Sequence, residues 1–248
     1  MTTDALGYRK KLAVLAPSTN TIVEPDFYRM SVPGVTAHFS RIHIRDQDLS
    51  SDANFEALLD QIRAEIDSAI ERVLTCEPGY MVMGMSAETF WEGIEGSRRF
   101  SAFVERKSGL SVSTGAAACE AALKIYKAKR IAVISPYQPV GGKNVRRFFE
   151  ELGYAVDEVV CLRCPTAVSI AQVQEDTLRE QLRAVDNDSV DAIVQVGTNL
   201  SMLRLADEAG RWLAKPVIAI NAATWWHALR ANGIQDRIDG CGSLLRNH

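Results

Sequence analysis

The chain has 248 residues, of which 47% are hydrophobic and 24% are charged, and its formal net charge is −3 at neutral pH. This length allows one large domain or two small ones, each with an ample core. No basic stripe with interleaved aromatic residues is present, and no apolar run approaches the roughly 18–20 residues that cross a membrane. We therefore expect neither nucleic acid nor a membrane as a partner.

The start of the chain contains no apolar stretch that resembles a signal peptide. Five cysteines, an odd number, argue against a disulfide framework. These features predict a cytoplasmic protein, and we also expect a homo-oligomer.

Short apolar runs alternate with amphipathic stretches along nearly the whole chain. Residues 12–16, 80–84, 131–135, 192–196 and 217–220 are apolar without alternation, which is typical of strands covered on both faces of a parallel sheet. A further strand is expected at 35–44. Apolar residues recur at helical spacing over 55–73, 145–152, 178–185 and 205–213, and these stretches predict amphipathic helices. A final helix is expected around 222–231.

Two strands end in the same way in both halves of the chain. Residues 11–17 (KLAVLAP) reappear as 130–136 (RIAVISP), and 81–86 (MVMGMS) is echoed by 193–199 (IVQVGTN). Pro17 and Pro136 are 119 residues apart, and Gly84 and Gly197 are 113 apart. The agreement indicates duplication of one unit. We predict an α/β chain of two pseudo-symmetric, doubly wound parallel-sheet units, with the active site in the cleft between them. The first unit covers residues 1–115 and the second covers 116–219, with residues 220–248 packed back on the first.

Ligands of open parallel sheets bind beyond the carboxyl ends of the strands. Four loops follow such ends, and all are rich in hydroxyl and amide groups that suit a small anion at a helix start. Their candidate substrate-binding residues are Ser18, Asn20, Gly84, Met85, Ser86, Gly197, Thr198 and Asn199, with Tyr137 at the fourth loop. Taken singly, each side chain could be a simple helix cap, but corresponding positions in a duplicated fold favour a shared site.

The sequence indicates no nucleotide cofactor and no metal. It has neither a Walker loop nor a G-x-G-x-x-G after the first strand, so Gly141-Gly142 is interpreted as a turn. None of the four histidines lies at ligand spacing to another, and the single C-x-x-C at 161–164 has no second pair.

Five segments carry a resemblance to a known family: residues 16–25 (APSTNTIVEP), 135–137 (SPY), 197–200 (GTNL), 216–221 (PVIAIN) and 240–245 (GCGSLL). With them the chain resembles the maleate isomerase and arylmalonate decarboxylase group of the aspartate/glutamate racemase superfamily over roughly residues 9–245. The resemblance implies cofactor-independent catalysis on a substrate buried between two α/β halves. It also implies that Asn20, Tyr137 and Asn199 bind substrate and that the loop after Gly84 supplies oxyanion contacts.

The chain departs from this family at the catalytic thiols. Racemases and maleate isomerases carry a cysteine at the end of each corresponding strand, and the decarboxylase keeps the second. Here these positions are Gly84 and Gly197, and none of the five cysteines replaces them. A thiolate is the nucleophile that such mechanisms need. Another group must therefore carry the reaction.

Glu88 is the leading candidate, because it lies in the loop that should touch substrate and burial would raise its pKa to a useful range. The alternative is a solvated or helix-start carboxylate. Glu24 and Asp26 are the next candidates, and Tyr137 could donate a proton or hydrogen bond.

Three functional classes stay open. The first is decarboxylation or isomerisation of a small carboxylate or dicarboxylate through a stabilised enediolate, without cysteine catalysis. The second is hydrolysis of a small lactone, lactam or amide by a Glu88-activated water. The third is a non-catalytic protein that binds dicarboxylates.

Overall fold

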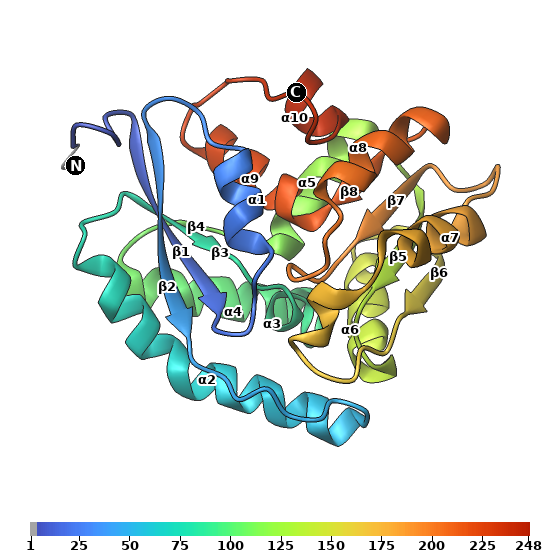
Figure 1. Ribbon diagram of the computed structural model, residues 1–248, viewed down its shortest axis with the longest axis horizontal. Coiled ribbons are helices and arrows are strands. Elements are labelled where there is room, and N and C mark those ends of the chain that lie inside the picture. Colours follow the sequence, from blue (N-terminus) through green and yellow to red (C-terminus); the bar gives the residue numbers. More distant parts are fainter. Residues whose placement is uncertain (1–3) are drawn as a thin grey trace.

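The computed structural model describes residues 4–248, which form two four-stranded parallel sheets flanked by helices (Figure 1). This architecture confirms the predicted α/β class with two pseudo-symmetric units. The strands of the first sheet are β1 (Lys10–Pro17), β2 (Val35–Ile42), β3 (Tyr80–Met83) and β4 (Val112–Ser113). Those of the second are β5 (Arg130–Ser135), β6 (Ala155–Cys161), β7 (Ala192–Gln195) and β8 (Val217–Ala219).

The helices that lie between the first four strands, or directly follow them, are α1 (Val23–Arg29), α2 (Asp52–Leu74), α3 (Ala87–Phe90), α4 (Gly93–Ser108) and α5 (Gly115–Tyr126). The later ones are α6 (Pro139–Glu151), a 3-10 turn (Ser169–Gln172), α7 (Glu175–Val185), α8 (Leu203–Trp212), α9 (Ile220–Ala231) and α10 (Ser243–Asn247).

Both sheets have the same strand order, which is β2-β1-β3-β4 in one and β6-β5-β7-β8 in the other. All pairs are parallel, so the carboxyl ends of β1, β3, β5 and β7 lie at one edge of each sheet. Because helices cover both faces, β3 and β7 are buried at every position. This burial explains why apolar residues follow one another in these strands without alternation.

Helix α2 forms where the sequence offers both a cap and an apolar stripe. The Ser51 side chain accepts a hydrogen bond from the amide of Asn54 at the helix start. Phe55, Leu58 and Ile62 lie on the buried face, which packs on β1 and β2. The same face therefore supplies side chains to the space beyond the strand ends.

Two features differ from the sequence-based prediction. Gly141 and Gly142 are not a turn but lie inside α6, which begins with Pro139 at its first turn. A Cβ at Gly142 would collide with the Cys161 sulfur, so the glycine lets α6 approach β6 closely. The strands β4 and β6 were not predicted, since β4 has only two residues and β6 carries an acidic pair at its centre.

The last segment of the chain returns to the first half. Helix α9 packs against α5, α1, β3 and β4, and the indole of Trp225 donates a hydrogen bond to the carbonyl of Met30. The residue boundaries of the two units stay a prediction. No helix within residues 4–248 is long and apolar enough to cross a membrane.

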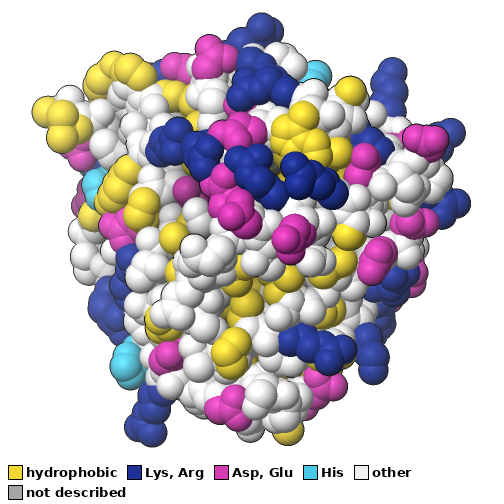
Figure 2. All heavy atoms as spheres, turned by 45° about the vertical axis from the view of Figure 1, so that its right-hand side comes forward, with side chains coloured by type: hydrophobic (Ala, Val, Ile, Leu, Met, Phe, Trp, Pro, Cys, Tyr) yellow, Lys and Arg dark blue, Asp and Glu magenta, His cyan; other side chains and the backbone are white. Residues whose placement is uncertain are grey.

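Charges of both signs are interspersed on the face that carries α7 and α8 (Figure 2). Here Glu175 and Glu208 form ion pairs with Arg179 and Arg204. Exposed pairs of this kind contribute little to stability, about 0–1 kcal/mol each. This face therefore presents mixed charge, not a field of one sign.

Candidate active site

A small cavity lies beyond the strand ends, between the two halves, and leaves about 60 Å³ in which the centre of a water molecule can move. Its polar wall comes from the loops after β1, β3, β5 and β7 and contains Thr19, Asn20, Ser86, Tyr137, Thr198 and Asn199. Its apolar wall contains Ile44, Leu49, Phe55, Leu58, Ile62, Met85 and Ile170. No charged side chain lines it among the described residues. An anion held here would therefore be bound by neutral hydrogen-bond donors.

Ser86 and Tyr137 form a buried hydroxyl pair in this wall. The Ser86 Oγ lies 2.5 Å from the Tyr137 phenol oxygen and also accepts a hydrogen bond of 3.1 Å from the amide of Gly197. Burial raises the pKa of Tyr137 far above its ordinary value, and the bond to Ser86 opposes this shift. The phenol is thus protonated and available as a donor at neutral pH.

A second chain of hydrogen bonds joins the two halves beside this pair. The Asn20 amide donates to the Thr198 hydroxyl at 3.0 Å, and that hydroxyl donates to the Gly84 carbonyl at 3.0 Å. Asn20 also supports the start of α1, whose N-cap is Ile22, because its side-chain oxygen accepts bonds from the amides of Ile22 and Val23. The side chain that supports the helix start is therefore also a site residue here.

Asn199 ties two loops together at the cavity. Its side-chain oxygen accepts a bond of 2.9 Å from the Thr21 amide, and its nitrogen donates to the Ala167 carbonyl at 2.9 Å. These contacts hold the loop after β7 against the loop after β1. The polar wall is thus fixed before any ligand arrives.

Backbone amides at two of the strand ends add donors. Within residues 4–248, the N–H groups of Met85, Ser86, Thr198 and Asn199 have no hydrogen-bond partner. Buried amides are nearly always paired, so a cluster of unpaired ones around a cavity indicates a place for an acceptor. Carboxylate or enolate oxygen is such an acceptor.

Ser18 and Gly84 do not line the cavity, contrary to the prediction of direct substrate contact. Ser18 is exposed, and its hydroxyl bonds to the backbone N and O of Ile44, so it braces the loop after β1. Gly84 donates its amide to the Leu15 carbonyl and accepts the Thr198 hydroxyl, so it acts as part of the scaffold.

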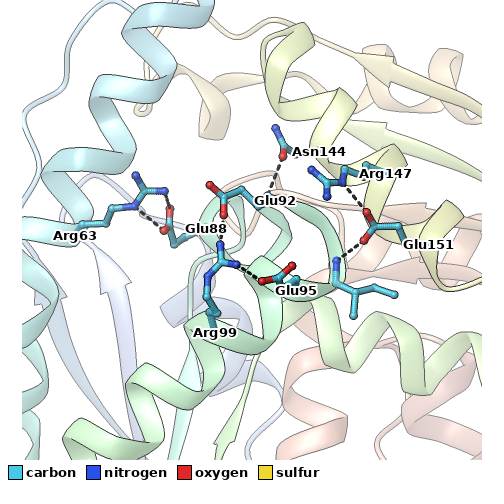
Figure 3. A network of polar contacts seen from close by, with 9 residues as sticks. Arg63, Glu88, Glu92, Glu95, Arg99, Asn144, Arg147 and Glu151 are labelled. Atoms are coloured by element: carbon cyan, nitrogen blue, oxygen red, sulfur yellow. Dashed lines mark hydrogen bonds and ion pairs between the residues drawn. The ribbon is translucent and has the colours of Figure 1, made fainter.

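Glu88, which the sequence places in the substrate-contacting loop, does not line this cavity. Its carboxylate is bound by Arg63 of α2, with 2.8 Å from the arginine Nε to the nearer oxygen (Figure 3). It lines a second, separate cavity on the other side of α3. Burial raises the pKa of Glu88, and the Arg63 guanidinium opposes that rise. An ion-paired carboxylate outside the cavity has no route to a water inside it.

Both strand-end glycines are closely packed, and Gly197 more so than Gly84. A Cβ at Gly84 would lie 3.0 Å from the Leu15 carbonyl oxygen, and one at Gly197 would collide with the ring of Pro136. Gly197 also has φ +94°, a region that side chains disfavour. No cysteine lines the cavity among residues 4–248, and burial raises the pKa of the Cys119 thiol to about 12. Over the same residues, no group of three or more acidic, histidine or cysteine side chains is placed to hold a metal.

The apolar wall is not predictable from the sequence. The spacing of Phe55, Leu58 and Ile62 indicates the packed face of a helix, and it gives no sign that this face continues past the sheet edge. Ile170 belongs to a segment for which no element was predicted. Thr19 lies between two predicted site residues and was not itself predicted.

The fold and the site define the class of this protein: an α/β protein of two pseudo-symmetric units, each with a parallel sheet, and a small cavity whose described lining residues carry no charge. A sequence model of the arylmalonate decarboxylase family matches residues 38–245, so the chain belongs to that family. The membership indicates an enzyme with isomerase- or decarboxylase-like activity.

Relatives and solved structures cover nearly the whole chain. The chain is 25% identical to a maleate isomerase of Pseudomonas putida, over 95% of this chain and 96% of the relative. A Nocardia farcinica maleate cis-trans isomerase with a covalently bound succinylcysteine intermediate superposes with a TM-score of 0.86 at 20% identity, covering 96% of this chain and 99% of that one. An arylmalonate decarboxylase superposes with a TM-score of 0.75 at 17% identity, covering 95% and 98%. These structural matches establish the fold.

Proposed function

We propose that the protein decarboxylates a small malonate-type dicarboxylate through an enediolate, without a thiol and without a cofactor. The observation that carries this proposal is the Ser86–Tyr137 pair, which stands next to the unpaired strand-end amides in a cavity without charged side chains among the described residues. These amides donate hydrogen bonds to the oxygen atoms of the enediolate, on which negative charge develops. An oxyanion site stabilises its intermediate in this way.

The apolar wall serves the bond cleavage. A carboxylate placed against Leu49, Phe55 and Leu58 loses its hydration shell, which destabilises the charged group. The neutral CO₂ that forms from it is not destabilised by the apolar wall, so bond cleavage becomes more favourable. The bond between this carboxylate and the α-carbon breaks, and its electron pair passes into the enediolate that the amides hold. Tyr137 then delivers a proton to the α-carbon and recovers one from solvent through Ser86. A phenol of high pKa protonates only a strong base, and the enediolate carbon is one.

Isomerisation, which belongs to the same functional class as decarboxylation, and the two other classes have less support. Isomerisation about a double bond needs a nucleophile that adds and leaves again, and no thiol of the described residues lines the cavity. Hydrolysis depends on Glu88, which faces the second cavity. A non-catalytic binding protein would not require a proton donor beside the amides. Loss of that donor would therefore leave the function of such a protein unchanged.

Isotope incorporation separates the reactions. With methylmalonate as the probe, turnover in D₂O should place deuterium on the α-carbon, and turnover in ¹⁸O-labelled water should leave the propionate product free of ¹⁸O. No turnover of this probe, together with ¹⁸O incorporation into the acid formed from a small lactone or amide, would instead establish hydrolysis. Binding of the probe with no turnover of any of these compounds would establish a non-catalytic protein.

Tyr137→Phe tests the donor directly. Loss of a proton-transfer group should lower kcat by about 10²–10⁴-fold while the variant still binds the probe. Tyr80→Phe is the matched control, because Tyr80 forms a buried pair of 3.1 Å with Ser113 outside the cavity. Equal turnover in the two variants would contradict the assigned role of Tyr137.

A further inference from the structure

A second cavity lies back to back with the active-site cavity. It leaves about 360 Å³ for the centre of a water molecule and lies among α2, α3 and α4. Its apolar wall contains Ile66, Trp91, Phe100 and Phe103, and its charged rim contains Arg63, Glu88, Glu92 and Arg99. This volume lies within the range of small-molecule sites, about 300–1,000 Å³.

One side chain belongs to both cavities. Ile62 lines each of them and is 3% exposed, while its neighbours on α2 divide between the two. Leu58, one turn earlier, lines only the active-site cavity, and Ile66, one turn later, lines only the second. The Ile62 side chain is therefore a partition between two adjoining spaces.

Helix α3 shows the same division. Ala87 lines the active-site cavity, and the next residue, Glu88, lines the second. The ion pair between Glu88 and Arg63 fastens α3 to α2 beside Ile62 (Figure 3). The partition is thus held from both sides by packed or paired groups.

We propose that Ile62 determines substrate size, by closing off the second cavity as an unused extension of the active site. This inference rests on the proposed carboxylate site, and it states which residue limits the size of the substrate that the site accepts. A substituent on the substrate's α-carbon meets the Ile62 side chain at the end of the 60 Å³ cavity. Removal of that side chain opens a passage into a space lined by Trp91, Phe100 and Phe103, which suits an aromatic substituent.

The chain provides a matched control for this test. Ile66→Ala removes the same side chain, 2% exposed, from the same helix one turn away, but at a position outside the active-site cavity. Both variants remove the same atoms from the packed face of α2, so a general loss of packing should affect both equally. A difference between them then reports the position of Ile62. Ile62→Val provides a milder change if Ile62→Ala does not fold.

The measurement is the affinity for methylmalonate and benzylmalonate, which share two carboxylates and differ in the substituent, by titration calorimetry. The wild type and Ile66→Ala should prefer methylmalonate. Ile62→Ala should shift the affinity ratio toward benzylmalonate by about tenfold or more, the scale of added apolar contacts in a pocket, and Ile62→Val should shift it less. An unchanged ratio in both Ile62 variants would overturn the proposal. Failure of the wild type to bind either probe would overturn the carboxylate site and, with it, this inference.

Discussion

Gly197 shows how a single backbone position shapes the site. Its amide donates to Ser86, and its φ of +94° turns the chain so that Thr198 and Asn199 follow along the cavity. The ring of Pro136 fills the space where a side chain would begin. Glycine at this position is therefore required by the conformation as well as by the packing.

Gly197→Ala should destabilise the protein by about 2–4 kcal/mol, because backbone strain of about 1–3 kcal/mol adds to overpacking against Pro136. Gly240→Ala is the control: Gly240 has φ +73° but nothing lies within 4 Å of the point that an alanine methyl group would occupy, so this variant carries the strain alone. Urea unfolding of both variants measures the difference. Equal losses would show that Pro136 moves aside freely.

Among the elements, α1 and α9 meet through a partly buried carboxylate. Asp26 of α1 accepts a bond of 2.8 Å from the Asn221 side chain of α9, and the same Asn221 nitrogen donates to the Thr198 carbonyl. Burial raises the pKa of Asp26 to about 6. The Asn221 side-chain oxygen is buried without a partner among the described residues.

This carboxyl makes stability depend on pH. Because the folded state holds the Asp26 proton more tightly than the unfolded chain, whose pKa is near 3.8, its contribution to stability rises as pH falls from about 7 to about 4. Asp26→Asn should therefore stabilise the protein by about 1–2 kcal/mol at pH 7.5, and the gain should fade below pH 6.

Urea unfolding at pH 7.5 and pH 5 checks this expectation. Asp48→Asn is the control, since side-chain and backbone bonds from Ser50 lower the pKa of Asp48, and its removal should give no gain at high pH. If Asp26→Asn were less stable than the wild type at pH 7.5, the favourable interactions of the ionised carboxylate would outweigh the cost of its desolvation, and the expectation would be wrong.

The sequence predicts elements well where burial is uniform. The cores of β1 and β5 are continuous apolar runs because helices cover both their faces, and the predicted strands lie within the observed bounds. The strand β6 lies at a sheet edge with Asp157 and Glu158 exposed, so its composition is not that of a buried strand. Gly141 and Gly142 give a turn signal, yet they serve a close helix–strand approach that the sequence does not reveal.

The candidate site could be predicted where the topology determines position, but not where the direction of a single side chain decides. Topology alone places Asn20, Ser86, Tyr137, Thr198 and Asn199 together, because parallel strands end at one edge. The direction of Glu88 depends on α3, a helix of four residues whose consecutive side chains point to different sides. Such a turn cannot be phased from apolar periodicity, so the sequence does not reveal that this carboxylate points away from the cavity.

At the scale of the whole molecule, one buried acid holds the chain end to the second half. Asp207 of α8 is 3% exposed and accepts bonds from Arg211, from Arg246 of α10 and from the amide of Gly242. Its neighbour Glu208 binds Arg179 and Arg204 at the surface. The two adjacent acids thus have the same charge and opposite exposure.

Asp207→Ala should destabilise the protein by about 2–4 kcal/mol, because it leaves buried donors unpaired and releases the end of the chain. Glu208→Ala should cost much less, because its ion pairs lie at the surface, where solvent screens them. Chemical unfolding gives both values, and hydrogen exchange of the Gly242 amide reports the release. Similar costs for the two variants would contradict the anchoring role of Asp207.

The contact between Gly197 and Pro136 also constrains how this sequence can change over time. Replacement of the proline ring removes the collision that a side chain at residue 197 would meet, but the backbone strain at φ +94° stays. The two positions are 61 residues apart in the chain and yet are in direct steric conflict if residue 197 carries a side chain. A directed-evolution experiment that introduces a nucleophile at this strand end must therefore change Pro136 and also accept or relieve the strain of the backbone.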